Sequence, residues 1–212
     1  MKFANKLFTA FGLLVLAICI MTPMVSATDP APISFSGVGQ EASQKFTLDE
    51  GLSIFAMKHS GSSNFIVWLL DSNGNNVDLL ANVVGDFDGS KAVGISKPGD
   101  YILNIDADGP WTVDISQPRP QTAQSVPISF SGKGQQVSKL ITLNPGLTRF
   151  EMTHDGESNF IVWLLDSNGN NVDLLVNEVG AFDGSKATGI KYSGIYCLNI
   201  AADGNWKIDV SQ

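Results

Sequence analysis

One stretch of eighteen residues occurs twice in this chain without a change. SNFIVWLLDSNGNNVDLL stands at residues 63–80 and again at residues 158–175. The same offset of 95 residues aligns 32–117 (repeat 1) with 127–212 (repeat 2) without a gap, and 58 of the 86 aligned positions are identical. A unit of this length can bury one modest hydrophobic core. The chain is therefore predicted to fold as two copies of one small domain, joined by a short, partly stiff linker at residues 118–126.

The first 27 residues, 1–27, have the pattern of a secretory signal peptide. Lys2 and Lys6 give a positive start, an apolar stretch follows, and small residues precede a cleavage site after Ala27. An uncleaved membrane anchor is the alternative, but the apolar stretch is interrupted by polar residues and proline and is short for a span. The sequence predicts a secreted or cell-surface protein without a membrane span after cleavage. A short lead at residues 28–31 precedes repeat 1.

The charge of the chain narrows the classes of partner. The whole sequence has a net charge of −8, and removal of the signal peptide, which holds two lysines and no acidic residue, makes it −10. Nucleic acids and anionic membranes need clustered Lys and Arg, so neither is an expected partner. An acidic extracellular surface is compatible with divalent cations and with neutral polymers such as polysaccharides.

Cysteine usage excludes an intrachain disulfide in the mature protein. Cys197 is the only cysteine outside the signal peptide, and Ile102 stands at its position in repeat 1. A cysteine in place of an isoleucine is predicted to be a small buried hydrophobe. A reactive or intermolecular thiol is the alternative.

Hydrophobic alternation predicts an all-β fold. In repeat 2, Phe150, Met152 and His154 fall on one face of a strand with period two. The apolar run at residues 65–70 is too short for a typical helix and is expected to be a central strand covered on both faces. Turn residues recur every eight to twelve positions, including a predicted turn at residues 87–89. The pattern predicts two tandem β-sandwich, jelly-roll-like domains of about seven to eight strands each.

The loop DSNGN, at residues 71–75 and again at 166–170, resembles the start of a calcium loop. It lacks the glycine at position six and the glutamate at position twelve of an EF-hand. A hairpin turn stabilised by the leading aspartate is the favoured interpretation. An irregular calcium site is the alternative. Its expected ligands are the aspartates in and near the turns: Asp71, Asp78, Asp88, Asp166, Asp173 and Asp183.

Aromatic residues suggest a second kind of site. Four tryptophans fall on matched positions, and Trp111 with its copy Trp206 begins an alternating strand and is expected to point into the core. Trp68 and Trp163 lie in the apolar strand, where one face is expected to be covered only by a loop or a partner, and packing in the core is the alternative to a binding role. We predict these two as ligand-binding residues that stack on carbohydrate.

The two histidines are predicted to be structural. His59 and His154 each end an inward-facing row and are expected to bond to backbone at a strand end. No nucleophile-elbow motif accompanies them, and no metal-ligand cluster surrounds them in the sequence. Nothing in the pattern indicates an enzyme.

The apolar strand running into DSNGN, and the closing DADGPWTV at residues 106–113, resemble modules of the pre-peptidase C-terminal domain type. That resemblance implies a non-catalytic β-sandwich that binds polymers, proteins or cell surfaces, in some cases with calcium. Two hypotheses remain open. The first is a binding module for carbohydrate or another surface polymer, or for a surface protein. The second is a structural or assembly protein of the cell envelope or extracellular matrix, which would self-associate.

Overall fold

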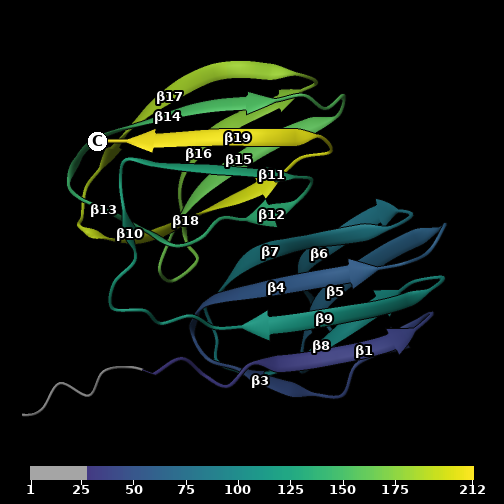
Figure 1. The fold of residues 1–212 in the computed structure, drawn as a ribbon. Coiled ribbons are helices and arrows are strands. Elements are labelled where there is room, and N and C mark those ends of the chain that lie inside the picture. Colours follow the sequence, from purple (N-terminus) through teal and green to yellow (C-terminus); the bar gives the residue numbers. More distant parts are fainter. Residues whose placement is uncertain (1–27) are drawn as a thin grey trace, which may run out of the picture.

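The computed structural model describes residues 28–212, and the predicted signal peptide lies outside that range. Within it the regular structure consists of strands, which confirms the all-β prediction (Figure 1). No helix in the described part of the chain is long and apolar enough to cross a membrane. Each repeat forms a sandwich of two sheets.

Repeat 1 contains nine strands in the described residues, two of them very short. They are β1 (Ile33–Val38), β2 (Glu41–Ala42), β3 (Phe46–Leu48), β4 (Gly51–His59), β5 (Asn64–Asp71), β6 (Asn76–Val84), β7 (Phe87–Ile95), β8 (Gly99–Asp106) and β9 (Pro110–Ser116). One sheet has the order β1-β9-β4-β7. The other has the order β2-β8-β5-β6, and β3 also pairs with β8.

Repeat 2 has the same topology with one added strand. Its strands are β10 (Gln124–Ser125), β11 (Ile128–Lys133), β12 (Gln136–Val137), β13 (Ile141–Leu143), β14 (Gly146–His154), β15 (Asn159–Asp166), β16 (Asn171–Val179), β17 (Phe182–Ile190), β18 (Gly194–Ala201) and β19 (Asn205–Ser211). The orders are β11-β19-β14-β17 and β10-β13-β18-β15-β16, and β12 also pairs with β18. The extra strand β10 comes from the predicted linker.

Alternation along the strands builds one core in each sandwich. In repeat 1, Phe55 and Met57 from one sheet meet Phe65 and Leu103 from the other, and all four are buried. Their chain neighbours point outward, as the period of two in a strand requires. Trp111 is buried as predicted, and its indole Nε1 donates to the carbonyl oxygen of Gly39 at 2.9 Å. Trp206 repeats this arrangement in repeat 2.

Of the predicted turns, the one at residues 71–75 forms, and the one at residues 87–89 does not. Asp71 closes the β5–β6 hairpin, because its Oδ1 accepts from the backbone N–H groups of Asn73 and Asn75 and Gly74 takes a positive φ of 84°. The predicted turn at residues 87–89 is wrong, because those residues are extended in β7 and pair with β4. The chain reverses just before them, at Gly85, which has the positive φ of 90° that the predicted turn lacks.

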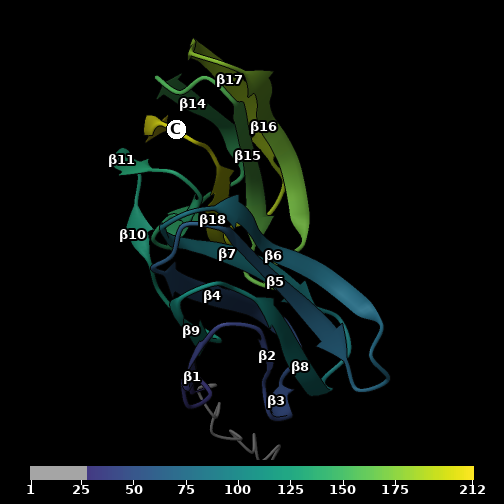
Figure 2. The same cartoon turned by 90° about the vertical axis from the view of Figure 1, so that its right-hand side faces the viewer.

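The two sandwiches pack against each other through unlike faces (Figures 1 and 2). The outer face of β4 and β7 in repeat 1 meets the outer face of β15 and β18 in repeat 2. Leu52 and Ala92 from the first face and Leu165 and Cys197 from the second form a separate buried apolar cluster. We call this contact the docking interface.

Hydrogen bonds attach the predicted linker, residues 118–126, to both sandwiches. The guanidinium of Arg119 donates to the carbonyl oxygens of Leu52 and Glu50 at 2.8 and 2.7 Å. Further on, β10 pairs in parallel with β13 of repeat 2. The connection is therefore held to both sandwiches, which favours a fixed docking of the repeats over a free tether.

Candidate binding cleft between the repeats

A cleft of about 550 Å³ lies beside the docking interface. Strands β6 and β7 of repeat 1 form one wall, and β15 and β18 of repeat 2 form the other. The lining of the cleft has one aromatic side chain and several polar ones. The residues that matter for recognition are Trp163, Asp78, Lys91, Gln135, Asn171 and Asn199.

Trp163 lines the cleft because successive side chains of a strand point to opposite faces of the sheet. Its neighbours Val162 and Leu164 are fully buried in the core of repeat 2, so Trp163 must point to the outer face of β15. Repeat 1 covers part of that face, and Trp163 packs against the docking cluster while it also lines the cleft. Trp68 occupies the same place on β5 of repeat 1 and is likewise half-buried, but it lies outside the cleft.

Asp78 gives the cleft a carboxylate. Its Oδ1 accepts from Lys91 Nζ at 2.7 Å, and the same ammonium also donates to the carbonyl oxygen of Leu79 at 2.7 Å. In repeat 2 the equivalent Asp173 also accepts a hydrogen bond at Oδ2, from the hydroxyl of Thr188 at 2.8 Å. Val93 stands at the position of Thr188 in repeat 1 and has no hydroxyl to donate. The cleft therefore has a carboxylate oxygen available to a ligand.

Two amide side chains hold β7 and β6 of repeat 1 against repeat 2. Asn199 accepts from the backbone N–H of Ala92 at 3.2 Å and donates to its carbonyl oxygen at 3.3 Å. Gln135 donates to the carbonyl oxygen of Leu80 at 2.9 Å. The hydroxyl oxygen of Ser90 accepts from the N–H of Val137 at 2.8 Å. The bonds to Ala92 and Ser90 pair polar groups along the free edge of β7 and join the two walls of the cleft.

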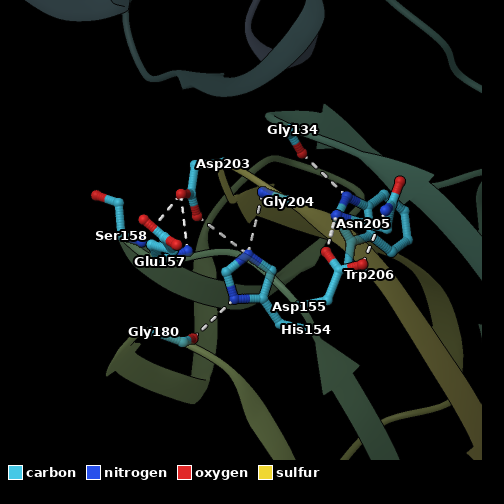
Figure 3. Close-up of polar contacts among 10 residues, drawn as sticks. All are labelled: Gly134, His154, Asp155, Glu157, Ser158, Gly180, Asp203, Gly204, Asn205 and Trp206. Atoms are coloured by element: carbon cyan, nitrogen blue, oxygen red, sulfur yellow. Dashed lines mark hydrogen bonds and ion pairs between the residues drawn. The ribbon is translucent and has the colours of Figure 1, made fainter.

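The histidines occupy matched positions at the end of each sandwich, and Figure 3 shows the surroundings of His154 in repeat 2. The Nδ1 of His154 lies 2.9 Å from the carbonyl oxygen of Gly180, so this nitrogen carries a proton and donates. Its Nε2 accepts from the N–H of Gly204 at 3.2 Å and lies 3.2 Å from Asp203 Oδ1. The ring stacks on Phe160 at a centroid distance of 4.7 Å. The predicted backbone bond is confirmed, and both ring nitrogens of His154 are occupied by structural contacts.

The aspartate beside each histidine ties a loop to the sandwich. In repeat 1, Asp108 Oδ2 accepts from the backbone N–H groups of Ser62 and Ser63 and from the Ser62 hydroxyl. The backbone bond from Ser62 is the main cause that lowers the pKa of Asp108 below 3.8. Ser62 donates to the carboxylate, so this serine, histidine and aspartate do not form the relay of a nucleophilic triad.

The six aspartates predicted as calcium ligands have separate places. Asp71 and Asp166 cap their own hairpins. Asp78 and Asp173 pair with lysines of neighbouring strands, and Asp88 pairs with Lys58 at 3.1 Å. Asp183 lies on the outer face of repeat 2, in a shallow hollow of about 400 Å³. Residues 28–212 contain no group of three or more His, Cys, Asp or Glu side chains placed to hold a metal ion. Calcium binding stays a prediction.

Cys197 lies in the docking interface, which the sequence alone did not indicate. It is fully buried against Leu52 and Ala92, and Ile102, its counterpart in repeat 1, is only half-buried. Burial raises the pKa of the Cys197 thiol to about 12, and the nearby charge of Asp166 adds to that shift. The thiol is therefore protonated and covered at neutral pH, as a packing residue should be.

No family model matches this chain, so the resemblance to pre-peptidase C-terminal modules is not confirmed, and no curated protein matches it either. Among solved structures, the PBSX exported protein XepA is 10% identical over 88% of this chain and 87% of its own, with a TM-score of 0.29. A tandem CBM22 domain of Paenibacillus barcinonensis Xyn10C is 9% identical over 85% and 92%, with a TM-score of 0.26. A fucolectin from striped bass serum is 8% identical over 84% and 83%, with a TM-score of 0.23. Similarities of this size leave the function to be argued from the cleft itself.

Proposed function

We propose that the protein is an exported, non-enzymatic binding module that holds a neutral polysaccharide in the cleft between its repeats. The observation that carries the proposal is that Trp163, the carboxylate of Asp78 and the amide of Asn171 line the same cleft. The apolar face of a sugar ring packs on an indole, and sugar hydroxyls bond to carboxylate and amide groups. The net negative charge favours a neutral polymer over an acidic one.

The proposal assigns different roles to two tryptophans with identical sequence surroundings. Trp163 has a second wall opposite it, contributed by β6 and β7 of repeat 1. Trp68 lies on the outer face of repeat 1, outside this cleft. A concave site buries more of a ligand than an open sheet face, so Trp163 is the binding residue of the pair.

Purified residues 28–212 on a glycan and polysaccharide array would test this function. Trp163→Ala is expected to weaken binding by at least about tenfold, because a central tryptophan contributes much of the free energy of a binding site. Trp68→Ala is the matched control and should bind as the unaltered protein does. Equal losses from both variants, or no glycan bound by any of them, would overturn the proposal.

The same array with calcium and then with a chelator separates two modes of recognition. Binding that survives the chelator and is weakened by Asp78→Asn supports direct contact with the sugar. Binding that requires calcium would assign recognition to a metal held by the aspartates instead, and Asp88→Asn would then weaken it as well.

A structural or assembly role is the second candidate function. Its support is the apolar outer face of β5 in repeat 1, which has the same sequence as the outer face of β15 that repeat 1 partly covers in docking.

A further inference from the structure

The docking interface joins two different faces, and the duplication leaves one copy of each unused. Repeat 1 docks with its β4–β7 face, and repeat 2 docks with its β15–β18 face. Because the repeats have the same fold, repeat 1 also has a β5–β8 face and repeat 2 also has a β14–β17 face. These two free faces lie on opposite sides of the pair of sandwiches (Figure 1).

The free faces keep apolar residues at the four positions of the docking cluster, with more charged residues around them. On the β5–β8 face, Leu70 and Ile102 stand where Leu165 and Cys197 stand in the interface, and both are half-buried. On the β14–β17 face, Leu147 stands where Leu52 stands. Leu52 is 1% exposed and Leu147 is 69% exposed. An apolar side chain this exposed on a sheet face, opposite a second apolar face, is suited to a contact between chains.

The polar groups of the docking interface are also present on the free faces. Asn199 bonds both backbone groups of Ala92 in the interface, and the free copies of these residues are Asn104 and Ala187, both exposed. The hydroxyl of Ser90 and the amide of Gln135 take part in docking, and their copies, Ser185 and Gln40, are exposed serine and glutamine as well. The edge of β17 therefore offers the backbone groups that the edge of β7 uses.

We propose that chains of this protein associate head to tail, the β14–β17 face of one copy docking on the β5–β8 face of a second copy. The contact repeats the docking interface between molecules. Because it joins unlike faces, each added chain leaves one face of each kind free, and the assembly grows without closing at a dimer. The inference rests on the docking interface and is independent of the polysaccharide proposal.

Two substitutions make this contact weaker than docking within a chain. Ile54 and Leu140 pack against the docking cluster, and their copies on the free faces are Arg149 and Lys45. Association would bring these two positive side chains into the contact, where they lose hydration, and Arg149, which pairs with Glu151 at 2.7 Å, would be buried with its partner. Docking within a chain also has the advantage of a short connection, which raises the effective concentration of the two faces. Association is therefore expected at high protein concentration.

Sedimentation velocity of residues 28–212 over a wide concentration range tests the proposal. The average mass is expected to rise beyond that of a dimer as concentration increases. Arg149→Ile, which restores the residue of repeat 1, should strengthen association by at least roughly tenfold. If Arg149→Ile stays monomeric over the whole range, or if assembly stops at a dimer, the proposal is wrong.

Variants that block one face each give the sharper experiment, made in the Arg149→Ile background. Leu147→Asp blocks the face of repeat 2, and Ile102→Asp blocks the face of repeat 1. Each alone should be monomeric, and an equal mixture should form a dimer and nothing larger, because one good face of each kind remains. Larger species in either single variant, or a mixture that stays monomeric, would overturn the head-to-tail arrangement.

A control variant excludes a general effect of surface charge. Val179→Asp adds the same charge at a position that is 74% exposed on the other sheet of repeat 2. It should associate as the Arg149→Ile parent does. Thermal unfolding of every variant, compared with the parent, verifies that the sandwiches are intact, and loss of association in Val179→Asp would contradict the assignment of the faces.

Discussion

The strands β5 and β15 have the same eight residues and different surroundings. In both, Phe, Val and Leu at alternate positions are buried in a sandwich core. On the outer face, Leu165 is 2% exposed because repeat 1 covers it, while its copy Leu70 is only half-buried. The local sequence thus determines the strand and its inward face. The neighbouring domain determines whether the outward face is a packed interface, a cleft wall or a free surface.

The β4–β7 face of repeat 1 and the β14–β17 face of repeat 2 show the same dependence on docking, with the repeats exchanged. There Leu52 of repeat 1 is covered, and Leu147 of repeat 2 is exposed. Every matched pair of residues at the two faces therefore contains one docked and one undocked member. Each pair can be changed one member at a time, so that the effect of docking is measured against an internal control.

The largest effect is expected from an acidic residue at the docked leucine. Leu52→Asp places an unpaired carboxylate in the apolar cluster and should remove about 3–5 kcal/mol of docking free energy. Leu147→Asp makes the same change on an exposed face and should leave docking unchanged. The readout is the labelling of Cys197 by a thiol reagent at mildly alkaline pH. It should be slow in the parent, whose thiol has a pKa of about 12, and fast in Leu52→Asp.

Labelling at the same slow rate in Leu52→Asp and Leu147→Asp would show that the docking cluster does not hold the repeats together. The comparison requires protein concentrations low enough to keep the chains apart. Circular dichroism of both variants should match the parent, because Leu52 packs in the docking cluster and not in the core of its own sandwich.

A smaller effect is expected where the two backbones approach each other. A Cβ added to Gly94 would lie 2.8 Å from the carbonyl oxygen of Gly169 in the other repeat, whereas a Cβ on its copy Gly189 would meet open space. Gly94→Ala should therefore cost docking about 1–3 kcal/mol through crowding. Gly189→Ala should leave the docking free energy unchanged. Accelerated labelling of Cys197 in Gly94→Ala alone is the expected result, and equal rates in the two variants would contradict this contact.

The sequence was sufficient for the fold because the signals are local. The alternation of Phe150, Met152 and His154 predicts a half-buried strand wherever it occurs, and the Asp71 hairpin depends on contacts within five residues. The predicted turn at residues 87–89 failed since Gly85, two residues earlier, makes the reversal. That left Gly89 extended and paired with Met57 on β4.

The cleft could not be predicted, because identical residues give no sign of which copy is covered. Trp68 and Trp163 are equal in the sequence and differ only through docking, and the residues that distinguish the docked faces from their copies lie outside the repeated block. One signal was present: Ile54 became Arg149, an apolar residue replaced by a charged one on a strand face. Such a change marks the face of repeat 1 as the one suited to burial. The predicted burial of Cys197 was correct, but Leu52 and Ala92 in its cluster come from the other repeat.

The smallest effect concerns the hydroxyl that distinguishes Asp173 from Asp78. Thr188→Val removes the hydrogen bond to Asp173 Oδ2 without changing the shape of the side chain. It should lower the free energy of unfolding by about 1 kcal/mol, because the carboxylate is partly solvated.

The pH dependence of this effect follows from the pKa of Asp173. Burial raises that pKa, but the bonds from Thr188 and Lys186 outweigh burial and keep it below 3.8. A carboxyl whose pKa is lower in the folded state stabilises the fold above its unfolded pKa and loses that contribution as the pH falls through its folded pKa. Urea unfolding should therefore separate Thr188→Val from the parent at neutral pH, and the gap should close in acid. The reverse change, Val93→Thr, should add a hydroxyl that donates to the carboxylate of Asp78, and it should therefore weaken glycan binding. A stability gap that persists unchanged in acid would show that Thr188 acts through packing and not through its bond to Asp173.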